Sequence, residues 1–417
     1  MPEPLRIHIG HHFFGAGNIG DDFMLAGFLA TAREMLGSVE LTCCVPFPLG
    51  PLLRRFPEIE WLPLNDALRD ACVRECDVWL GLGDTPFQID AGPWMLDHLA
   101  AEAARCRALG RPMFFLGVGV ESPDVFAFPQ VDKILSETTR IFTRDGGSAA
   151  LLRAQMDPDR VEEGADLAHV FLQELARSPI EKGTIAFTLN FESASQYSKE
   201  SVNSLVENFG AQRSLWQVQE VRPLPGSEMA LLDALRPDLR NRLILCKPDY
   251  VSARTVESLV AVWESPEVWC TSRYHAALAG AWAGARTIAI ERSAKIRFGA
   301  EQVGLEMISS ITDQSAIRRA VSQAEPASRA RLAGLARTSR RMVTQMIKAA
   351  RSEPRRAEDR GVTRHEWGRA VRALAEREQT LTESLTVAEA DRAARLRVIE
   401  DQGAQIEQLR SREFQAA

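Results

Sequence analysis

The sequence predicts an α/β protein with two doubly wound halves, each built on a parallel sheet, that face each other across a cleft. Three observations support this fold class. The chain has 417 residues, more than the ~250–300 that one hydrophobic core usually serves. Its short apolar runs are apolar throughout, as strands covered on both faces must be. These runs alternate with amphipathic helical stretches, and the alternation pauses once and then restarts.

Residues 1–178 are expected to form the first half. Its predicted strands lie at Leu5–Ile9, Leu41–Val45, Val78–Leu82, Met113–Val120 and Ile141–Thr143. Helical stretches separate them, near residues 21–36, 65–75, 92–109, 128–138 and 146–156. Strand, helix and strand in this order, joined by right-handed crossovers, predict one parallel sheet between two layers of helices.

Residues 179–352 are expected to form the second half, after a polar pause at residues 177–183. Its predicted strands lie at Thr184–Asn190, Gln217–Val221, Leu243–Cys246, Val268–Cys270 and Thr287–Ile290. Helical stretches lie near residues 198–208, 228–236, 252–263, 274–283 and 296–304. A cleft between two such halves, at the carboxyl ends of the strands, is the expected ligand site.

Residues 353–417 are expected to form a helical tail. Residues 317–372 contain fifteen Lys or Arg against five Asp or Glu, so this part of the chain is basic. This basic stretch could be a solvated helix face, or it could contact an anionic lipid surface or an acidic partner. Apolar residues then recur near a 3.5-residue period in residues 371–409. They predict a coiled coil that pairs chains, with a solitary helix as the alternative.

Composition excludes several classes of protein. The net charge of -6 argues against a protein that coats nucleic acid along its length. No apolar run reaches the ~20 residues that span a bilayer. Residues 1–6 lack the basic start and apolar stretch of a signal peptide, so we expect a cytoplasmic protein. The seven cysteines lack a second pair at zinc spacing, and we expect them to be small buried hydrophobes rather than disulfides or metal ligands.

A glycine-rich turn, GAGNIGDD (15–22), follows the first predicted strand. Its three glycines, Gly20 among them, have the spacing of a phosphate-binding loop, but Asp21 and Asp22 stand where a pyrophosphate would lie. Two interpretations remain open. The carboxylates could cap the next helix and compensate its dipole. They could instead accept hydrogen bonds from sugar hydroxyls, with Asn18 as a second polar contact.

The segment TSRYHAAL (271–278) places Arg273 and His275 at the end of an apolar run. These two residues could form a solvated strand-to-helix turn. Alternatively they could hold and protonate an anion, because histidine can be charged or neutral near pH 7. Lys295 follows the next predicted strand, and Arg144 follows a strand of the first half. Both could point into the cleft or form ion pairs at the surface.

Five motifs in order make the chain resemble the polysaccharide pyruvyltransferase family over roughly residues 7–310. They are GAGNIGDDFMLAGFL (15–29), GVGVE (117–121), TRDGGSAALL (143–152), GADL (164–167) and TSRYHAALAGAWAGARTIAIERSAKIRFG (271–299). Members of this family resemble glycosyltransferase-B-like enzymes of two domains. They move the enolpyruvyl group of phosphoenolpyruvate onto a sugar, usually as a ketal. The segment GLGDTPFQ (81–88) departs from the family, whose members often have a run of glycines there, and it leaves the acceptor open.

The resemblance implies a role for each site residue. Arg273 and His275 would be catalytic: Arg273 would grip the phosphate or carboxylate of phosphoenolpyruvate, and His275 would protonate the departing phosphate or the enol carbon. Arg144 and Lys295 would complete the anion clamp. The acceptor sugar would be held by residues of the first half, namely Asn18, Gly20, Asp21 and Asp22. The scheme needs no metal and no cofactor beyond phosphoenolpyruvate as donor substrate.

The expected partners are therefore phosphoenolpyruvate and a sugar or glycan acceptor, with no nucleic acid. The basic tail could bring the protein to the inner membrane, and the coiled coil could make it a homo-oligomer. Two other functions remain open. One is a glycosyltransferase that uses a nucleotide-sugar on the same fold. The other is a non-catalytic scaffold in which the helical tail is the functional part.

Overall fold

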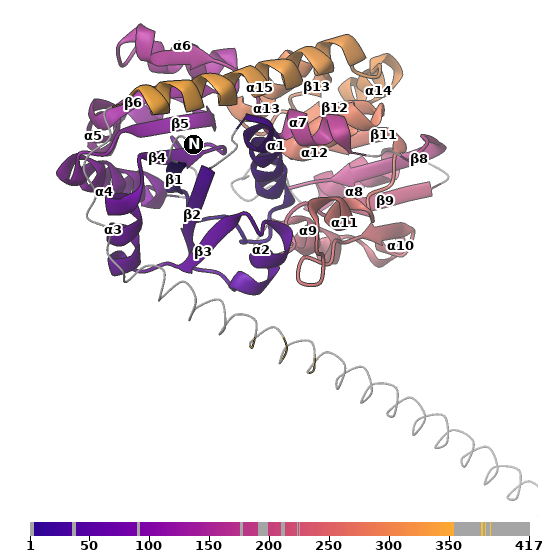
Figure 1. Cartoon of the computed structure of the whole chain (residues 1–417). Coiled ribbons are helices and arrows are strands. Elements are labelled where there is room, and N and C mark those ends of the chain that lie inside the picture. Colours follow the sequence, from indigo (N-terminus) through magenta and orange to yellow (C-terminus); the bar gives the residue numbers. More distant parts are fainter. Residues whose placement is uncertain are drawn as a thin grey trace, which may run out of the picture. The chain divides into compact units, whose positions relative to one another are not determined.

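Two parallel sheets form the core of the protein (Figure 1). The computed structural model describes residues 4–35, 39–89, 92–175, 178–190, 199–209, 213–222, 224, 226–353, 377, 380 and 384. Residues 1–364 make one unit and residues 365–417 a second, and everything described below lies in the first unit. The predicted coiled coil at residues 371–409, apart from three isolated helical positions, lies outside the described residues.

The first sheet has seven strands in the order β3-β2-β1-β4-β5-β6-β7. Their bounds are Leu5–Ile9 (β1), Val39–Val45 (β2), Ile59–Pro63 (β3), Val78–Leu82 (β4), Met113–Val118 (β5), Thr138–Thr143 (β6) and Val161–Glu163 (β7). The five predicted strands are confirmed. The two additional ones are the edge strands. One ends in proline and the other has three residues, two of them glutamates, so neither carries a strong strand signal.

The helices of the first half lie between these strands. Their bounds are Ile19–Met35 (α1), Leu49–Arg55 (α2), Asp66–Glu75 (α3), Trp94–Leu109 (α4), Pro129–Glu137 (α5), Gly146–Arg153 (α6) and Ala168–Glu174 (α7), with 3-10 turns at Pro123–Ala127 and Pro158–Arg160. Asp145 caps α6, because its carboxylate accepts a hydrogen bond from the Ser148 backbone N–H at 2.7 Å.

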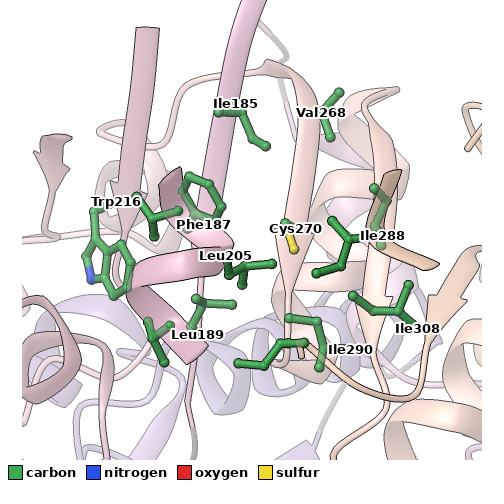
Figure 2. Packing of buried hydrophobic residues seen from close by; sticks show 14 of the residues in the cluster. Ile185, Phe187, Leu189, Leu205, Trp216, Val268, Cys270, Ile288, Ile290 and Ile308 are labelled. Atoms are coloured by element: carbon green, nitrogen blue, oxygen red, sulfur yellow. The ribbon is translucent and has the colours of Figure 1, made fainter. Parts of the chain in front are cut away.

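The second sheet has six strands in the order β10-β9-β8-β11-β12-β13. Their bounds are Glu181–Thr188 (β8), Arg213–Gln217 (β9), Leu243–Cys246 (β10), Pro266–Thr271 (β11), Arg286–Ile290 (β12) and Glu306–Ile308 (β13). One face of this sheet buries an aliphatic and aromatic cluster that includes Phe187, Cys270 and Ile288 (Figure 2). All seven cysteines of the chain are buried and free, as expected for small hydrophobes.

The helices of the second half are α8 to α15. Their bounds are Lys199–Asn208 (α8), Glu228–Ala234 (α9), Pro237–Arg240 (α10), Val256–Val260 (α11), Tyr274–Ala283 (α12), Ala294–Val303 (α13), Gln314–Gln323 (α14) and Arg329–Ser352 (α15). None of the helices in the described ranges is both long and apolar enough to cross a membrane.

One predicted strand is wrong in its bounds. The strand expected at Gln217–Val221 is β9, and it ends at Gln217. Val218 still donates its N–H to the Cys246 carbonyl of β10 at 3.1 Å, but the residues after it pair with the turn before α1. Asn18 and Glu220 form an antiparallel bridge, the Ile19 N–H donates to the Gln219 carbonyl at 3.1 Å, and the Val221 N–H donates to the Gly17 carbonyl at 3.0 Å. The extended pattern of this segment therefore joins the two halves.

Helix α15 also joins the two halves (Figure 1). Near its beginning, the Arg329 guanidinium donates to the Trp282 carbonyl of the second half at 2.6 Å. Farther along, α15 packs on α1, α7 and β5, and buries Met342 and Met346 there. Helix α15 therefore contacts both α/β halves. The predicted domain boundaries at residues 178 and 352 stay a prediction.

Candidate functional site

A cavity of about 660 Å³ lies between the two halves. Its walls are formed by residues that directly follow strands of both sheets, including Phe13 after β1, Phe47 after β2, Glu121 after β5 and Arg273 after β11. The cavity therefore opens at the carboxyl ends of the strands, where an α/β fold of this type is expected to bind ligands. Its volume is within the range of ~300–1,000 Å³ that is typical of small-molecule sites.

The charges in this cavity are divided between its two walls. Among the described residues, the first half contributes three carboxylates, from Asp21, Asp84 and Glu121. The second half contributes one carboxylate and four cations, from Glu220, Arg222, Arg273, Arg292 and Lys295. An anion is thus expected to bind against the second half, and a neutral or hydroxyl-rich molecule against the first.

Arg273 is the N-cap residue of α12 and lines the cavity. Its guanidinium forms a two-pronged ion pair with Glu228, with Nε to Oε1 at 2.8 Å and Nη2 to Oε2 at 3.0 Å. The Glu228 side chain is fully buried, and that of Arg273 is 11% exposed. The solvated turn that was one interpretation of TSRYHAAL is therefore wrong. Glu228 orients the guanidinium at the cavity wall.

His275 lies buried beside the cavity and is not among the described residues that line it. Its Nε2 is 3.6 Å from Asp166 Oδ2. Its ring packs on α1 at Gly20, where an added Cβ would lie 2.1 Å from His275 Nδ1. Arg273, as the N-cap residue, has extended backbone and precedes the helix, whereas His275 lies in the first turn of α12 and faces Gly20 of α1. In this conformation His275 supports the contact between the halves.

Arg144 is buried as well and is not among the described lining residues. Its Nη2 donates to Thr85 Oγ1 at 2.8 Å, and its guanidinium carbon lies 4.5 Å from the ring centroid of Tyr274. Its Nε is 3.7 Å from Asp145 Oδ2. Burial by itself would lower the pKa of Arg144, but Tyr274 and the nearby carboxylates raise it. Arg144 therefore connects the two halves, and its predicted contact with the donor stays a prediction.

Asn18 and Asp21 lie in the cavity wall as a connected pair. Asn18 Oδ1 accepts hydrogen bonds from the Gly20 N–H at 3.1 Å and from Gln219 Nε2 at 3.0 Å. Asn18 Nδ2 donates to Asp21 Oδ1 at 3.3 Å. Burial, Asp84 and other carboxylates raise the pKa of Asp21 well above its usual value. This environment favours the protonated form of the Asp21 carboxyl.

Asp22 points elsewhere, although it follows Asp21 directly. Its carboxylate is fully buried, with Oδ2 3.8 Å from Arg55 Nε, and it is not among the described lining residues. Burial raises its pKa to about 6, against the opposing effect of Arg55. Arg55 in turn donates from Nη1 to the Tyr250 carbonyl of the second half at 2.8 Å. Asp22 thus takes part in an ionic contact with Arg55, and its predicted sugar contact stays a prediction.

Lys295 lies in the first turn of α13 and lines the cavity beside Arg273 and Arg292. Burial and the neighbouring Arg292 lower the pKa of Lys295 to about 8. The ammonium group is therefore still charged at neutral pH, and an anion bound next to it would relieve the repulsion between the cations.

Comparison with known proteins identifies the family. The sequence matches the family described as Polysaccharide pyruvyl transferase over residues 18–293. The chain belongs to this family. Among curated proteins no significant match was found.

Solved structures share the fold at low sequence identity. The Staphylococcus aureus MnaA–UDP structure has a TM-score of 0.57 and 14% identity, and covers 87% of this chain and 100% of its own. UDP-GlcNAc 2-epimerase from Methanocaldococcus jannaschii has a TM-score of 0.53 and 12% identity, with coverages of 83% and 100%. Anabaena Alr3699/HepE in complex with UDP has a TM-score of 0.52 and 11% identity, with coverages of 84% and 100%. This chain therefore has the predicted glycosyltransferase-B-like fold.

Several residues of the site were not singled out from the sequence. Asp166, in the GADL motif of the family, is fully buried, and it accepts a hydrogen bond from the Ala168 N–H at 2.8 Å. Burial would raise the pKa of Asp166, but His275 and Arg144 lower it. Glu228 gave no signal in the sequence, because its partner Arg273 is 45 positions away.

Proposed function

We propose that this protein transfers the pyruvyl group of phosphoenolpyruvate to two hydroxyls of a sugar in a polysaccharide or glycan precursor, forming a pyruvate ketal. The observation that carries the proposal is the basic wall of the cavity, formed by Arg222, Arg273, Arg292 and Lys295, in a chain of the pyruvyl transferase family. Phosphoenolpyruvate carries a phosphate and a carboxylate, and the planar guanidinium fork fits either group.

The reaction balances without a further reactant. Carbon C3 of phosphoenolpyruvate gains a proton, which leaves C2 electron-deficient. One acceptor hydroxyl attacks C2 and releases its proton. The bond from C2 to the phosphate oxygen then breaks, its electron pair leaves with the phosphate, and the second hydroxyl closes the ketal and releases its proton. One proton replaces the proton given to C3, and the other leaves with the phosphate.

We infer that Asp21, rather than His275, gives the proton to C3. Asp21 lines the cavity opposite the basic wall, whereas His275 is buried against Gly20 and Asp166. Burial and the neighbouring Asp84 raise the pKa of Asp21 and so favour the protonated carboxyl that a general acid needs. Arg273 and Lys295 would then bind the donor, and Asn18 would contact the acceptor.

Two substitutions test this assignment. Asp21→Asn keeps an oxygen that can accept from Asn18 but removes the proton, so we expect turnover to fall by ~10²–10⁴. His275→Gln should cost more in stability than in turnover per folded molecule. Phosphate release from phosphoenolpyruvate measures turnover, and urea unfolding measures stability. If Asp21→Asn keeps wild-type turnover while His275→Gln loses it without unfolding, His275 is the proton donor.

The second candidate is a nucleotide-sugar-dependent glycosyltransferase, because proteins of the same fold such as MnaA and HepE were solved with UDP. The two candidates differ in the ligand that stabilises the protein. We expect phosphoenolpyruvate to raise the melting temperature, as a ligand that binds only the folded state must do, and UDP-sugars to leave it unchanged. The opposite result would favour the glycosyltransferase.

A further inference from the structure

Four aromatic rings of the first half line the cavity, from His12, Phe13, Phe47 and Trp94, and this part of the wall is called its aromatic end. Trp94 is the first residue of α4, and its side chain is 43% exposed. Its ring centroid is 5.8 Å from that of His12. All four residues belong to the first half, whereas the cations of the cavity wall belong to the second.

The exposure of Trp94 distinguishes it from the other tryptophans that the structure describes. Each of those six is at least partly buried and donates its indole N–H to a protein acceptor, and they are Trp61, Trp79, Trp216, Trp263, Trp269 and Trp282. Covering a large apolar ring that is exposed to water is favourable. A ligand that packs on a tryptophan in a cavity wall therefore gains binding free energy from the burial of the ring.

Polar groups of the same cavity fit a sugar rather than a purely apolar ligand. Gln88 and Glu121 lie in the wall near the aromatic end. Glu121 is buried, and one of its oxygens accepts the Ile89 N–H at 2.7 Å, which holds the loop after β4 that carries Gln88. Amide and carboxylate groups beside an aromatic face match a pyranose ring, which presents C–H groups on one face and hydroxyls around its edge.

His12 contributes an uncharged surface to this end of the cavity. Its Nδ1 lies 3.2 Å from His98 Nε2, and His98 Nε2 lies 2.9 Å from the Gly10 carbonyl, so the ring is fixed in position. Burial and the neighbouring His98 lower the pKa of His12 to about 3. The imidazole is therefore neutral at the pH of the cytoplasm, and it adds no positive charge that would attract an anion to this end.

We propose that the aromatic end of the cavity is a subsite for a neutral pyranose ring of the acceptor, with Trp94 as the surface on which the ring stacks. The proposal rests on the proposed function and assigns the two substrates to opposite ends of one cavity: the donor anion to the cations of the second half, and the sugar to the aromatic rings of the first. In this arrangement the hydroxyls of the bound sugar would face the donor.

Saturation-transfer difference NMR tests the subsite directly. The probes are the methyl pyranosides of glucose, galactose, mannose and N-acetylglucosamine at millimolar concentration. We expect at least one of them to bind the wild-type protein. Trp94→Ala should weaken that binding about tenfold or more, as truncation of an aromatic anchor does. Trp94→Phe, which keeps a flat apolar face, should lose only a few fold.

The matched control is Ile244→Ala on the edge strand β10, because Ile244 is also 43% exposed but lies outside the cavity wall. It should bind the pyranoside as the wild type does. The proposal is overturned if no pyranoside binds the wild type, or if Trp94→Ala binds as well as the wild type. The melting-temperature shift with phosphoenolpyruvate is measured on the same proteins and should be unaffected by Trp94→Ala. If that shift is absent from the wild type while pyranoside binding depends on Trp94, the donor assignment fails and the subsite stands.

Discussion

The ion pair between Arg273 and Glu228 predicts that stability and activity can be separated by two substitutions. Arg273→Ala alone leaves the fully buried Glu228 carboxylate without the guanidinium that holds both of its oxygens. Removal of one partner of a buried pair typically costs ~3–5 kcal/mol. Because Arg273 is 11% exposed and borders a cavity that water can enter, we expect the lower end, about 3 kcal/mol. This is a large part of the ~5–15 kcal/mol that stabilises a typical domain.

Adding Glu228→Gln to Arg273→Ala should recover most of that loss. Glutamine has nearly the same shape as glutamate and removes the unpaired negative charge, and the loss of both partners of a buried pair is often close to neutral. Turnover should not recover, because the cation that binds the donor is still missing. Urea unfolding followed by circular dichroism gives the free energy of unfolding, and phosphate release from phosphoenolpyruvate gives turnover.

Three outcomes would contradict this reasoning. If Arg273→Ala changes the free energy of unfolding by less than about 0.5 kcal/mol, the ion pair with Arg273 is not what stabilises the buried Glu228 carboxylate. If the double variant is no more stable than the single one, the unpaired carboxylate is not the cause of the loss. If the double variant regains turnover, Arg273 does not bind the donor. Arg273→Lys is a useful intermediate, since a lysine keeps the charge but not the two-pronged geometry.

The remaining predictions concern close packing and titration. Gly20→Ala should destabilise the protein by ~1–3 kcal/mol in urea unfolding, because its methyl group would overlap the His275 ring, whereas Gly334→Ala, with open space on α15, should stabilise it by ~0.5–1 kcal/mol. Equal effects at the two sites would exclude the close approach of His275. The pKa of Lys295 is lowered from 10.5 to about 8, so between pH 8 and pH 10.5 the unfolded chain binds one more proton than the folded protein. The free energy of unfolding should therefore rise with pH over this range. Over the same range the KM for phosphoenolpyruvate should increase, because Lys295 loses its charge. Lys295→Arg should abolish both trends, and an unchanged pH profile would remove Lys295 from the donor site. Burial lowers the pKa of His169 from 6.5 to about 4, so stability should fall as the pH drops through this interval. His169→Gln should reduce the slope of acid denaturation, and an unaltered slope would show that His169 is not titrating.

The sequence by itself determined the fold class and the location of the site. Runs such as Val78–Leu82 and Met113–Val118 are apolar throughout, a pattern that only a strand covered on both faces requires, so the two parallel sheets could be predicted locally. The turn before α1 and the turn between β11 and α12 could be placed at the cavity for the same reason, because both follow the carboxyl ends of parallel strands.

Only the tertiary structure decided which way each side chain of these turns points. Asp21 and Asp22 are neighbours in sequence, yet one lines the cavity and the other pairs with Arg55, because successive residues on a helix differ by about 100° in direction. Arg273 and His275 also diverge, because Arg273 is the extended N-cap residue of α12 and lines the cavity, while His275 lies in the first turn and faces Asp166.

The partners of these side chains were decided at the same level. Glu228, which orients Arg273, and Asp166, which faces His275, come from elements distant in the chain. The segment after β9 was predicted to be strand, but residues 219–221 pair with the turn at Asn18. Backbone pattern is a local property and can be inferred from neighbouring residues, whereas ion pairs and cavity walls arise between segments that only the packing of the two halves brings together.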